Sequence, residues 1–215
     1  MTQHYFNTPD GPAQASTISI ELAGRPVTLH TADGVFSGRR LDQGTAVLLD
    51  VADAQLPPPG AGNLLDLGCG YGPIALWMAL QTPGATVWAV DVNDRALELT
   101  AANAAELGLD NVRASRPEDV PADVRFDRIM SNPPIRVGKQ ALHDILAGWL
   151  PRLTRDGDAD LVVNRNLGAD SLAGWLSRQG YLVEKLASRK GFRVLQVTAT
   201  AGGAGPAAGT DTEPS

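Results

Sequence analysis

The sequence predicts an α/β fold: a seven-stranded, mostly parallel sheet with helices on both faces and a hairpin before it. From residue 63 onward, short apolar runs alternate with segments of helical length, as in strand–helix–strand units. The last two predicted strands, 182–188 and 192–200, are separated only by a turn, so they should run antiparallel. A glycine-rich turn follows the first regular strand, where such sheets commonly bind ligands.

The segment before residue 63 is less regular. Residues 1–16 are polar and contain Pro and Gly, which predicts a loosely ordered N-terminal segment. Residues 17–31 alternate in polarity on either side of a glycine turn, as in a β-hairpin. A helix is predicted over about 45–55, with Thr45 or Asp42 as its cap, and the prolines that follow end it.

The regular elements then follow in order. Further strands are predicted at 63–68, 86–91, 112–115, 126–131 and 159–165. Helices are predicted at 73–82, 94–107, 139–150 and 168–179. Residues 17–200 therefore form one folded domain, and the Ala/Gly/Pro/Thr-rich residues 201–215 are expected to be a disordered tail.

Composition limits the class of protein. The net charge of −6 combines −8 in residues 1–130, +4 in residues 131–200 and −2 in residues 201–215, so either a local basic face in the last third or chance scatter fits. The sequence lacks a membrane-length apolar run, a secretory leader and a Cys/His metal cluster, and Cys69 has no cysteine partner. We expect a cytoplasmic protein with no membrane and no metal partner.

Residues 64–72 read Leu-Leu-Asp-Leu-Gly-Cys-Gly-Tyr-Gly, a buried strand that runs into a glycine loop before Pro73. Glycines let a backbone approach a ligand closely, although a tight turn without a ligand would also use them. The third glycine comes one residue earlier than in the dinucleotide fingerprint, and a carboxylate before the loop suits a ligand with a charged amine. The pattern resembles motif I of class I S-adenosylmethionine-dependent methyltransferases. This resemblance implies that the loop binds the cofactor through Asp66, Gly68, Cys69, Gly70 and Gly72.

Asp91 ends the second strand of the regular region, 23 residues after Gly68. An acid there can accept hydrogen bonds from both ribose hydroxyls of a nucleoside cofactor, and Val92 offers an apolar face to adenine. Residues 91–94 could also be only a helix cap.

Asn132, Pro133, Pro134 and Ile135 follow the carboxyl end of a predicted strand and are the candidate catalytic residues. The Asn amide oxygen and a backbone carbonyl stiffened by the prolines can accept both hydrogens of an exocyclic NH2 group. Two fixed acceptors favour a tetrahedral nitrogen and aim its lone pair at a sulfonium methyl group. A Pro-Pro turn that merely ends a strand is the structural alternative.

Several motifs together are similar to the small "MTS" methyltransferase family over about residues 4–198. The matching segments are 34–37, 41–45, 132–136, 138–139, 142–143 and 191–195. The resemblance implies similarity to ribosomal RNA small-subunit methyltransferase C, hence guanine-N2 methylation of ribosomal RNA or the small subunit. It also implies an acid near the adenine amine, for which Asp119 or Glu118 is available. That branch usually has an extra N-terminal domain and an aromatic residue where this chain has Ile135.

Other functions remain open at this level: a protein glutamine N-methyltransferase, whose amide NH2 fits the same two acceptors, or a non-catalytic cofactor-binding module. Candidate substrate contacts are Phe36, Arg136, Lys139, Arg189 and Lys190. The cations could bind phosphates or be ordinary solvated surface, and Phe36 could be core.

Overall fold

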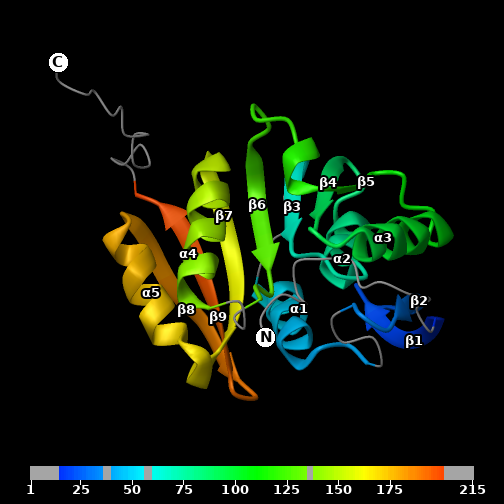
Figure 1. The fold of residues 1–215 in the computed structure, drawn as a ribbon, viewed down its shortest axis with the longest axis horizontal. Helices are drawn as coiled ribbons and strands as arrows, with labels where there is room; N and C mark the ends of the chain where they lie inside the picture. Colours follow the sequence, from blue (N-terminus) through cyan, green and yellow to red (C-terminus); the bar gives the residue numbers. More distant parts are fainter. Residues whose placement is uncertain (1–14, 36–39, 56–59, 135–137, 201–215) are drawn as a thin grey trace.

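The structure is a computed structural model that describes residues 15–35, 40–55, 60–134 and 138–200. Its centre is a seven-stranded sheet of order β5-β4-β3-β6-β7-β9-β8 (Figure 1). The strands are β3 (Gly62–Leu67), β4 (Ala85–Val90), β5 (Val112–Ser115), β6 (Phe126–Ser131), β7 (Leu153–Asn164), β8 (Tyr181–Arg189) and β9 (Phe192–Ala199). The first five are parallel, and β9 runs antiparallel to both β7 and β8, which confirms the predicted mixed sheet.

Helices cover both faces of this sheet, as predicted. They are α1 (Gln43–Gln55), α2 (Pro73–Gln81), α3 (Asp94–Glu106), α4 (Lys139–Trp149) and α5 (Ala169–Arg178). One apolar core joins α1, α2 and α3 to residues such as Leu64 and Met130 on one face. The other joins α4 and α5 to Leu65 and Ile129, whose side chains point the opposite way because strand side chains alternate. None of the helices in the described ranges is long and apolar enough to cross a membrane.

The hairpin is a separate two-stranded sheet made of β1 (Ala15–Leu22) and β2 (Arg25–Ala32). β1 begins two residues before the predicted start. Asn103 of α3 binds this hairpin: its Oδ1 accepts from the His30 N–H at 2.7 Å, and its Nδ2 donates to the His30 carbonyl at 3.0 Å. Nδ2 also donates to the Tyr71 carbonyl at 2.9 Å. One buried side chain therefore links the hairpin, α3 and the glycine loop.

The predicted start of β7 at residue 159 is wrong, because the strand begins at Leu153. The polar stretch Thr-Arg-Asp-Gly-Asp at 154–158 is typical of a turn, yet it continues the strand with a shift in register against β6. Gly157 makes this possible: a Cβ there would lie 2.8 Å from the Phe126 carbonyl oxygen. The strand passes close to its neighbour only because this residue has no side chain.

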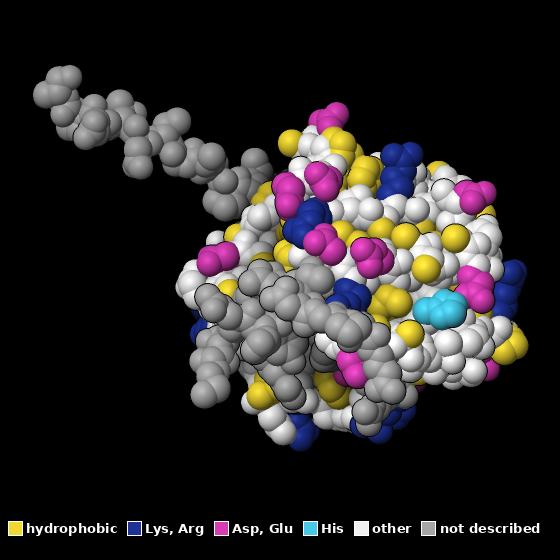
Figure 2. All heavy atoms as spheres, turned by 45° about the vertical axis from the view of Figure 1, so that its right-hand side comes forward, with side chains coloured by type: hydrophobic (Ala, Val, Ile, Leu, Met, Phe, Trp, Pro, Cys, Tyr) yellow, Lys and Arg dark blue, Asp and Glu magenta, His cyan; other side chains and the backbone are white. Residues whose placement is uncertain are grey.

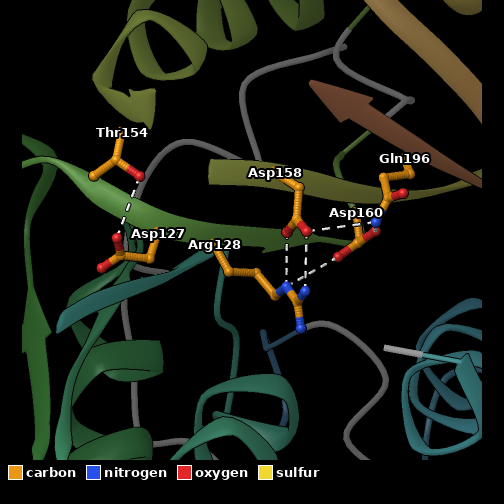
Figure 3. Close-up of polar contacts among 6 residues, drawn as sticks. All are labelled: Asp127, Arg128, Thr154, Asp158, Asp160 and Gln196. Atoms are coloured by element: carbon orange, nitrogen blue, oxygen red, sulfur yellow. Dashed lines mark hydrogen bonds and ion pairs between the residues drawn. The ribbon is translucent and has the colours of Figure 1, made fainter. Parts of the chain in front are cut away.

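A polar cluster lies within the sheet between β6, β7 and β9 (Figure 3). The Arg128 guanidinium donates to both carboxylate oxygens of Asp158, at 2.7 and 2.9 Å, and its Nε lies 3.4 Å from Asp160 Oδ2. Gln196 Nε2 donates to Asp160 Oδ1 at 3.4 Å. Asp160 is fully buried, and burial, followed by the charge of Asp158, raises its pKa to about 7. This cluster therefore holds a carboxyl group that burial disfavours in its charged form.

Candidate active site

The glycine loop lies at the carboxyl ends of β3 and β4, where open parallel sheets bind ligands. Gly68, Gly70 and Gly72 have φ values of 81°, 59° and 94°, which side-chain-bearing residues rarely adopt. The backbone N–H groups of Gly68 and Cys69 both donate to the Val90 carbonyl, at 2.8 and 3.0 Å. The loop is therefore fixed to the end of β4.

Asp66 is completely buried beneath this loop. Its Oδ2 accepts from the Ala75 N–H of α2 at 2.9 Å, whereas its Oδ1 has no hydrogen-bond partner among the described residues. Burial raises the pKa of this carboxyl to about 8, and the charge of Asp91 adds to that effect. Oδ2 of Asp66 is thus bound to an N–H group of the helix start, whereas Oδ1 remains available for a ligand.

Tyr71 provides a second buried polar atom at the loop. Its hydroxyl, like Asp66 Oδ1, has no hydrogen-bond partner in the described part of the chain. Burial raises the pKa of this phenol, and the Asp42 carboxylate raises it further. A ligand that carries both an ammonium and a carboxylate group, such as the methionine part of S-adenosylmethionine, can partner an orphaned carboxylate oxygen and an orphaned hydroxyl. The residues present fit that cofactor.

Asp91 is brought to the loop as the sequence predicts. Its Oδ2 accepts from the Gly70 N–H and its Oδ1 from the Asn93 N–H, both at 3.0 Å. Burial raises its pKa, while these N–H groups act in the opposite direction. The cap of α3 is Asn93, whose side chain accepts from the Arg95 N–H at 3.1 Å. Asp91 is therefore not the helix cap, and Val92 lies half-buried beside it.

Cys69 is buried within the loop, and burial raises the pKa of its thiol well above the ordinary value. The Thr100 hydroxyl donates to the Gly70 carbonyl at 3.0 Å and lies 3.6 Å from the Cys69 sulfur. A neutral, enclosed thiol is a poor nucleophile, so this residue contributes packing and backbone to the loop.

Asn132 directly follows β6, and its side-chain amide is fixed from one side. Nδ2 donates to Asp42 Oδ2 at 2.7 Å and to Thr45 Oγ1 at 3.0 Å. A carboxylate only accepts hydrogen bonds, so the nitrogen must face Asp42 and the oxygen Oδ1 must face away. Pro133 is buried and Pro134 half-buried, which restrains the backbone that follows.

The local sequence pattern predicts only a helix cap at Thr45 or Asp42, and Asp42 has this role. Asp42 Oδ2 accepts from the Thr45 N–H at 3.0 Å, so Asp42 is the cap of α1. Asp42 lies 90 residues before Asn132, so the local sequence pattern does not predict their contact. The signal in the sequence is that Asp42 and Asn132 both lie in segments that resemble one family.

The remaining predicted site residues are more dispersed. Asp119 is exposed on a short 3-10 helix that follows β5. Lys139 is exposed at the start of α4, and Arg189 and Lys190 are exposed at the turn between β8 and β9. Phe36, Ile135 and Arg136 lie outside the described residues.

The β8–β9 turn nevertheless lies at the same edge of the sheet as Asn132 (Figure 1). The Arg165 N–H, just after β7, donates to the Gly191 carbonyl of this turn at 2.8 Å. Phe192, which begins β9, packs against Gly44 of α1, since a Cβ on Gly44 would lie 2.9 Å from its ring. In the described ranges, no group of three or more His, Cys, Asp or Glu side chains is arranged to hold a metal ion.

Comparison with known proteins identifies a family that matches most of this chain. The methyltransferase small domain (MTS) family matches residues 26–196. The chain is 32% identical to "Uncharacterized protein YbxB" of Bacillus subtilis (strain 168) over 200 residues, which cover 91% of this chain and 98% of that protein. It is 33% identical to ribosomal RNA small subunit methyltransferase C of Ectopseudomonas mendocina (strain ymp), over 87% of this chain and 56% of that protein.

Solved structures share the fold. The structure of the T. thermophilus 16S rRNA N2 G1207 methyltransferase (RsmC), in complex with AdoMet and guanosine, superposes with a TM-score of 0.72. It is 24% identical, and the match covers 89% of this chain and 52% of that one. The chain thus spans about half the length of the methyltransferase C relatives described here. With its glycine loop, orphaned Asp66 oxygen and fixed Asn132, this chain belongs to the methyltransferase small domain family and is an S-adenosylmethionine-dependent methyltransferase.

Proposed function

We propose that this protein methylates the exocyclic N2 amine of a guanine in the RNA of the small ribosomal subunit. The observation that carries the proposal is the orientation of Asn132. Both hydrogen bonds from Nδ2 go to α1 and its cap, so Oδ1 faces away from them and can accept from a substrate N–H. This oxygen lies at the sheet edge that also carries the glycine loop.

The chemistry needs such an acceptor because the lone pair of a guanine amine is delocalised into the ring. Asn132 Oδ1 would take one amine hydrogen, and a backbone carbonyl of the proline-stiffened segment would take the other. When bound, the cofactor would supply a methyl group on a sulfonium sulfur, and this sulfur would keep the electron pair of the broken C–S bond. The nitrogen then releases a proton to water, so the site needs no strong base before attack.

The cofactor would be held by the residues around the glycine loop. Asp66 Oδ1 is suited to the ammonium group, and the Tyr71 hydroxyl can partner the carboxylate. Asp91 has further lone pairs for the ribose hydroxyls, and Val92 supplies apolar surface for adenine. Asp119 stays a prediction for the adenine amine, as do Gly68, Cys69, Gly70 and Gly72 for the backbone contacts.

RNA as the substrate class is supported by the methyltransferase C relatives, which are 32–34% identical to this chain. It is also supported by the exposed cations Lys139, Arg189 and Lys190 at the sheet edge that carries Asn132. On the face of the molecule shown in Figure 2, acidic and basic side chains are interspersed among apolar ones. A phosphate backbone would approach more favourably over the β8–β9 turn than over that face.

The test is transfer of a tritiated methyl group from S-adenosylmethionine to purified small ribosomal subunits, to protein-free ribosomal RNA and to total cell protein. We expect label in RNA, and loss of at least about 100-fold in transfer rate with Asn132→Ala. The double variant Arg189→Ala/Lys190→Ala should raise the KM for RNA and leave the other kinetic parameters unchanged. Label confined to protein would overturn the proposal and favour a glutamine amide as acceptor.

A further inference from the structure

Asp42 is joined to Asn132 by a short hydrogen bond, 2.7 Å between Oδ2 and Nδ2. The same oxygen accepts from the Thr45 N–H, and Thr45 Oγ1 takes the second amide hydrogen of Asn132. We infer that Asp42, with Thr45, is a positioning residue for methyl transfer: it fixes the Asn132 amide and strengthens Oδ1 as an acceptor. The inference rests on the proposed function for the role of Oδ1.

The first effect is on orientation. An isolated Asn side chain can present either end of its amide, since oxygen and nitrogen are nearly the same size. Here, a flipped amide would place its oxygen against the Asp42 carboxylate and would lose both hydrogen bonds of Nδ2. The flipped form would also point two N–H groups at the substrate amine, which cannot accept them usefully. Asp42 therefore selects the one amide orientation that the reaction can use.

The second effect is electronic. A hydrogen bond from an amide N–H to an ionised carboxylate is stronger than one to a neutral acceptor. It draws the amide toward its charge-separated form, with more positive charge on nitrogen and more negative charge on Oδ1. The acceptor that meets the substrate amine thereby becomes stronger, without becoming a base that is itself protonated.

The surroundings of Asp42 hold its carboxylate in this position. The cap contact fixes it to the start of α1, and the Ala46 N–H donates to the Asp42 backbone carbonyl at 2.8 Å. On its other side, the space at Gly44 is full: a Cβ there would lie 2.9 Å from Asp42 Oδ2 and 2.9 Å from the Phe192 ring. The carboxylate is thus confined between the helix start, an aromatic ring and Asn132.

The experiment compares Asp42→Asn and Asp42→Ser in the full chain. Both replacements retain good helix-capping residues, so α1 should keep its cap. Asn retains an oxygen that can face Asn132 but lacks the charge, whereas Ser is too short to reach it. We expect kcat to fall about 10-fold in Asp42→Asn and about 100-fold in Asp42→Ser, with binding of S-adenosylhomocysteine changed by less than about 3-fold.

Asp127→Asn is the matched control at the opposite end of β6 (Figure 3). Its carboxylate also accepts from a backbone N–H, that of Asn63 at 3.1 Å, and from a threonine hydroxyl, that of Thr154 at 3.2 Å. It is remote from Asn132, so Asp127→Asn should retain the wild-type kcat. Equal losses in kcat for Asp127→Asn and Asp42→Asn would mean that both act through general stability, and the inference would fail.

A second readout does not depend on any substrate. The side-chain amide of Asn132 gives a pair of 1H–15N NMR signals, which are assigned by their absence from Asn132→Asp. We expect downfield, slowly exchanging protons in the wild type, and their shift toward ordinary values in Asp42→Ser. Unchanged amide signals, or a tenfold weaker affinity for S-adenosylhomocysteine with an unchanged kcat, would overturn the positioning role. Shifted signals without any RNA methylation would instead contradict the proposed substrate alone.

Discussion

At the scale of single residues, the chemistry of this site depends on which atoms are already satisfied by the protein. Asp66 and Asn132 each use one end of the side chain to bind a helix start. Asp66 Oδ2 accepts from the Ala75 N–H of α2, and Asn132 Nδ2 donates to Asp42, the cap of α1. Asp66 Oδ1 then has no hydrogen-bond partner among the described residues, and Asn132 Oδ1 faces away from Asp42. Their roles follow from this division, since an acceptor that is fixed from behind loses little entropy when it binds a donor.

Gly44→Ala tests this view without removing a hydrogen-bonding group. The new methyl group would lie 2.9 Å from both Asp42 Oδ2 and the Phe192 ring, so the carboxylate must shift away from Asn132. We expect about a tenfold fall in kcat, while overpacking of roughly 1–3 kcal/mol is partly offset by the better helix propensity of Ala. Gly148→Ala in α4, where a Cβ meets no atom within 4 Å, should raise stability by up to about 1 kcal/mol and leave kcat unchanged.

Asp66→Asn should separate cofactor binding from folding. The Asn oxygen can still accept from the Ala75 N–H, but an amide cannot ionise to pair with an ammonium group, as the Asp66 carboxyl can. We expect the Kd for S-adenosylhomocysteine, measured by calorimetry, to rise about 10- to 100-fold while the thermal midpoint is retained. An unchanged Kd would show that the free Oδ1 does not contact the ligand.

At the scale of elements, the β1–β2 hairpin depends on α3, because a two-stranded sheet is marginally stable on its own. Asn103 provides the link, with three hydrogen bonds to the backbones of His30 and Tyr71. The Gly34 carbonyl, just after β2, accepts from Asn93 at 3.3 Å, next to the Asp91 contact with the loop. The hairpin is thus tied to the segments that surround the cofactor site.

Asn103→Ala is therefore expected to lower the free energy of unfolding by about 2–4 kcal/mol, because it removes three hydrogen bonds to the backbone, of which the one to Tyr71 is buried. Amide hydrogen exchange in β2 should accelerate, and the affinity for S-adenosylhomocysteine should weaken. Asn111→Ala is the matched control, since Asn111 also donates to two carbonyls, those of Thr82 and Ala85, but not to the hairpin. If both variants accelerate exchange in β2 equally, Asn103 is not the specific link.

The elements could be predicted where one physical signal dominated. Alternation of strands and helices, and the turn between β8 and β9, were enough for the sheet and its antiparallel strand. The start of β7 was mispredicted because Gly157 looks like a turn residue locally, whereas its lack of a side chain serves a close strand contact. The glycine loop and Asp91 could be paired from spacing, but the contact of Asp42 with Asn132 depends on tertiary packing between α1 and β6.

At the scale of the whole molecule, buried carboxylates make stability depend on pH. Burial raises the pKa of Asp160 to about 7 and that of Asp66 to about 8, whereas the ordinary pKa of both groups is 3.8. Between these limits the folded state binds more protons than the unfolded chain. The free energy of unfolding should therefore fall as the pH rises from about 4 to 8. The fall should be steepest between about pH 4 and 7, where both groups contribute.

Asp160→Asn is expected to remove one group's share of this slope, up to about 1.4 kcal/mol per pH unit between pH 4 and 7. The variant should match the wild type near pH 4 and exceed its stability near pH 8, as measured by denaturant unfolding across that range. Asp158→Asn, which breaks the paired hydrogen bonds with Arg128, should instead lower stability at pH 7. A wild-type slope that persists unchanged in Asp160→Asn would contradict the buried, protonated state of Asp160.

Identification of the methylated nucleoside distinguishes a guanine amine from every other acceptor. Small-subunit ribosomal RNA that lacks the modification would be incubated with the protein and S-adenosylmethionine carrying a deuterated methyl group, then digested to nucleosides and analysed by mass spectrometry. We predict deuterated N2-methylguanosine with the wild-type protein and none with Asn132→Ala. Label on another nucleoside, or equal N2-methylguanosine from both proteins, would contradict the account of Asn132 as the acceptor for a guanine amine.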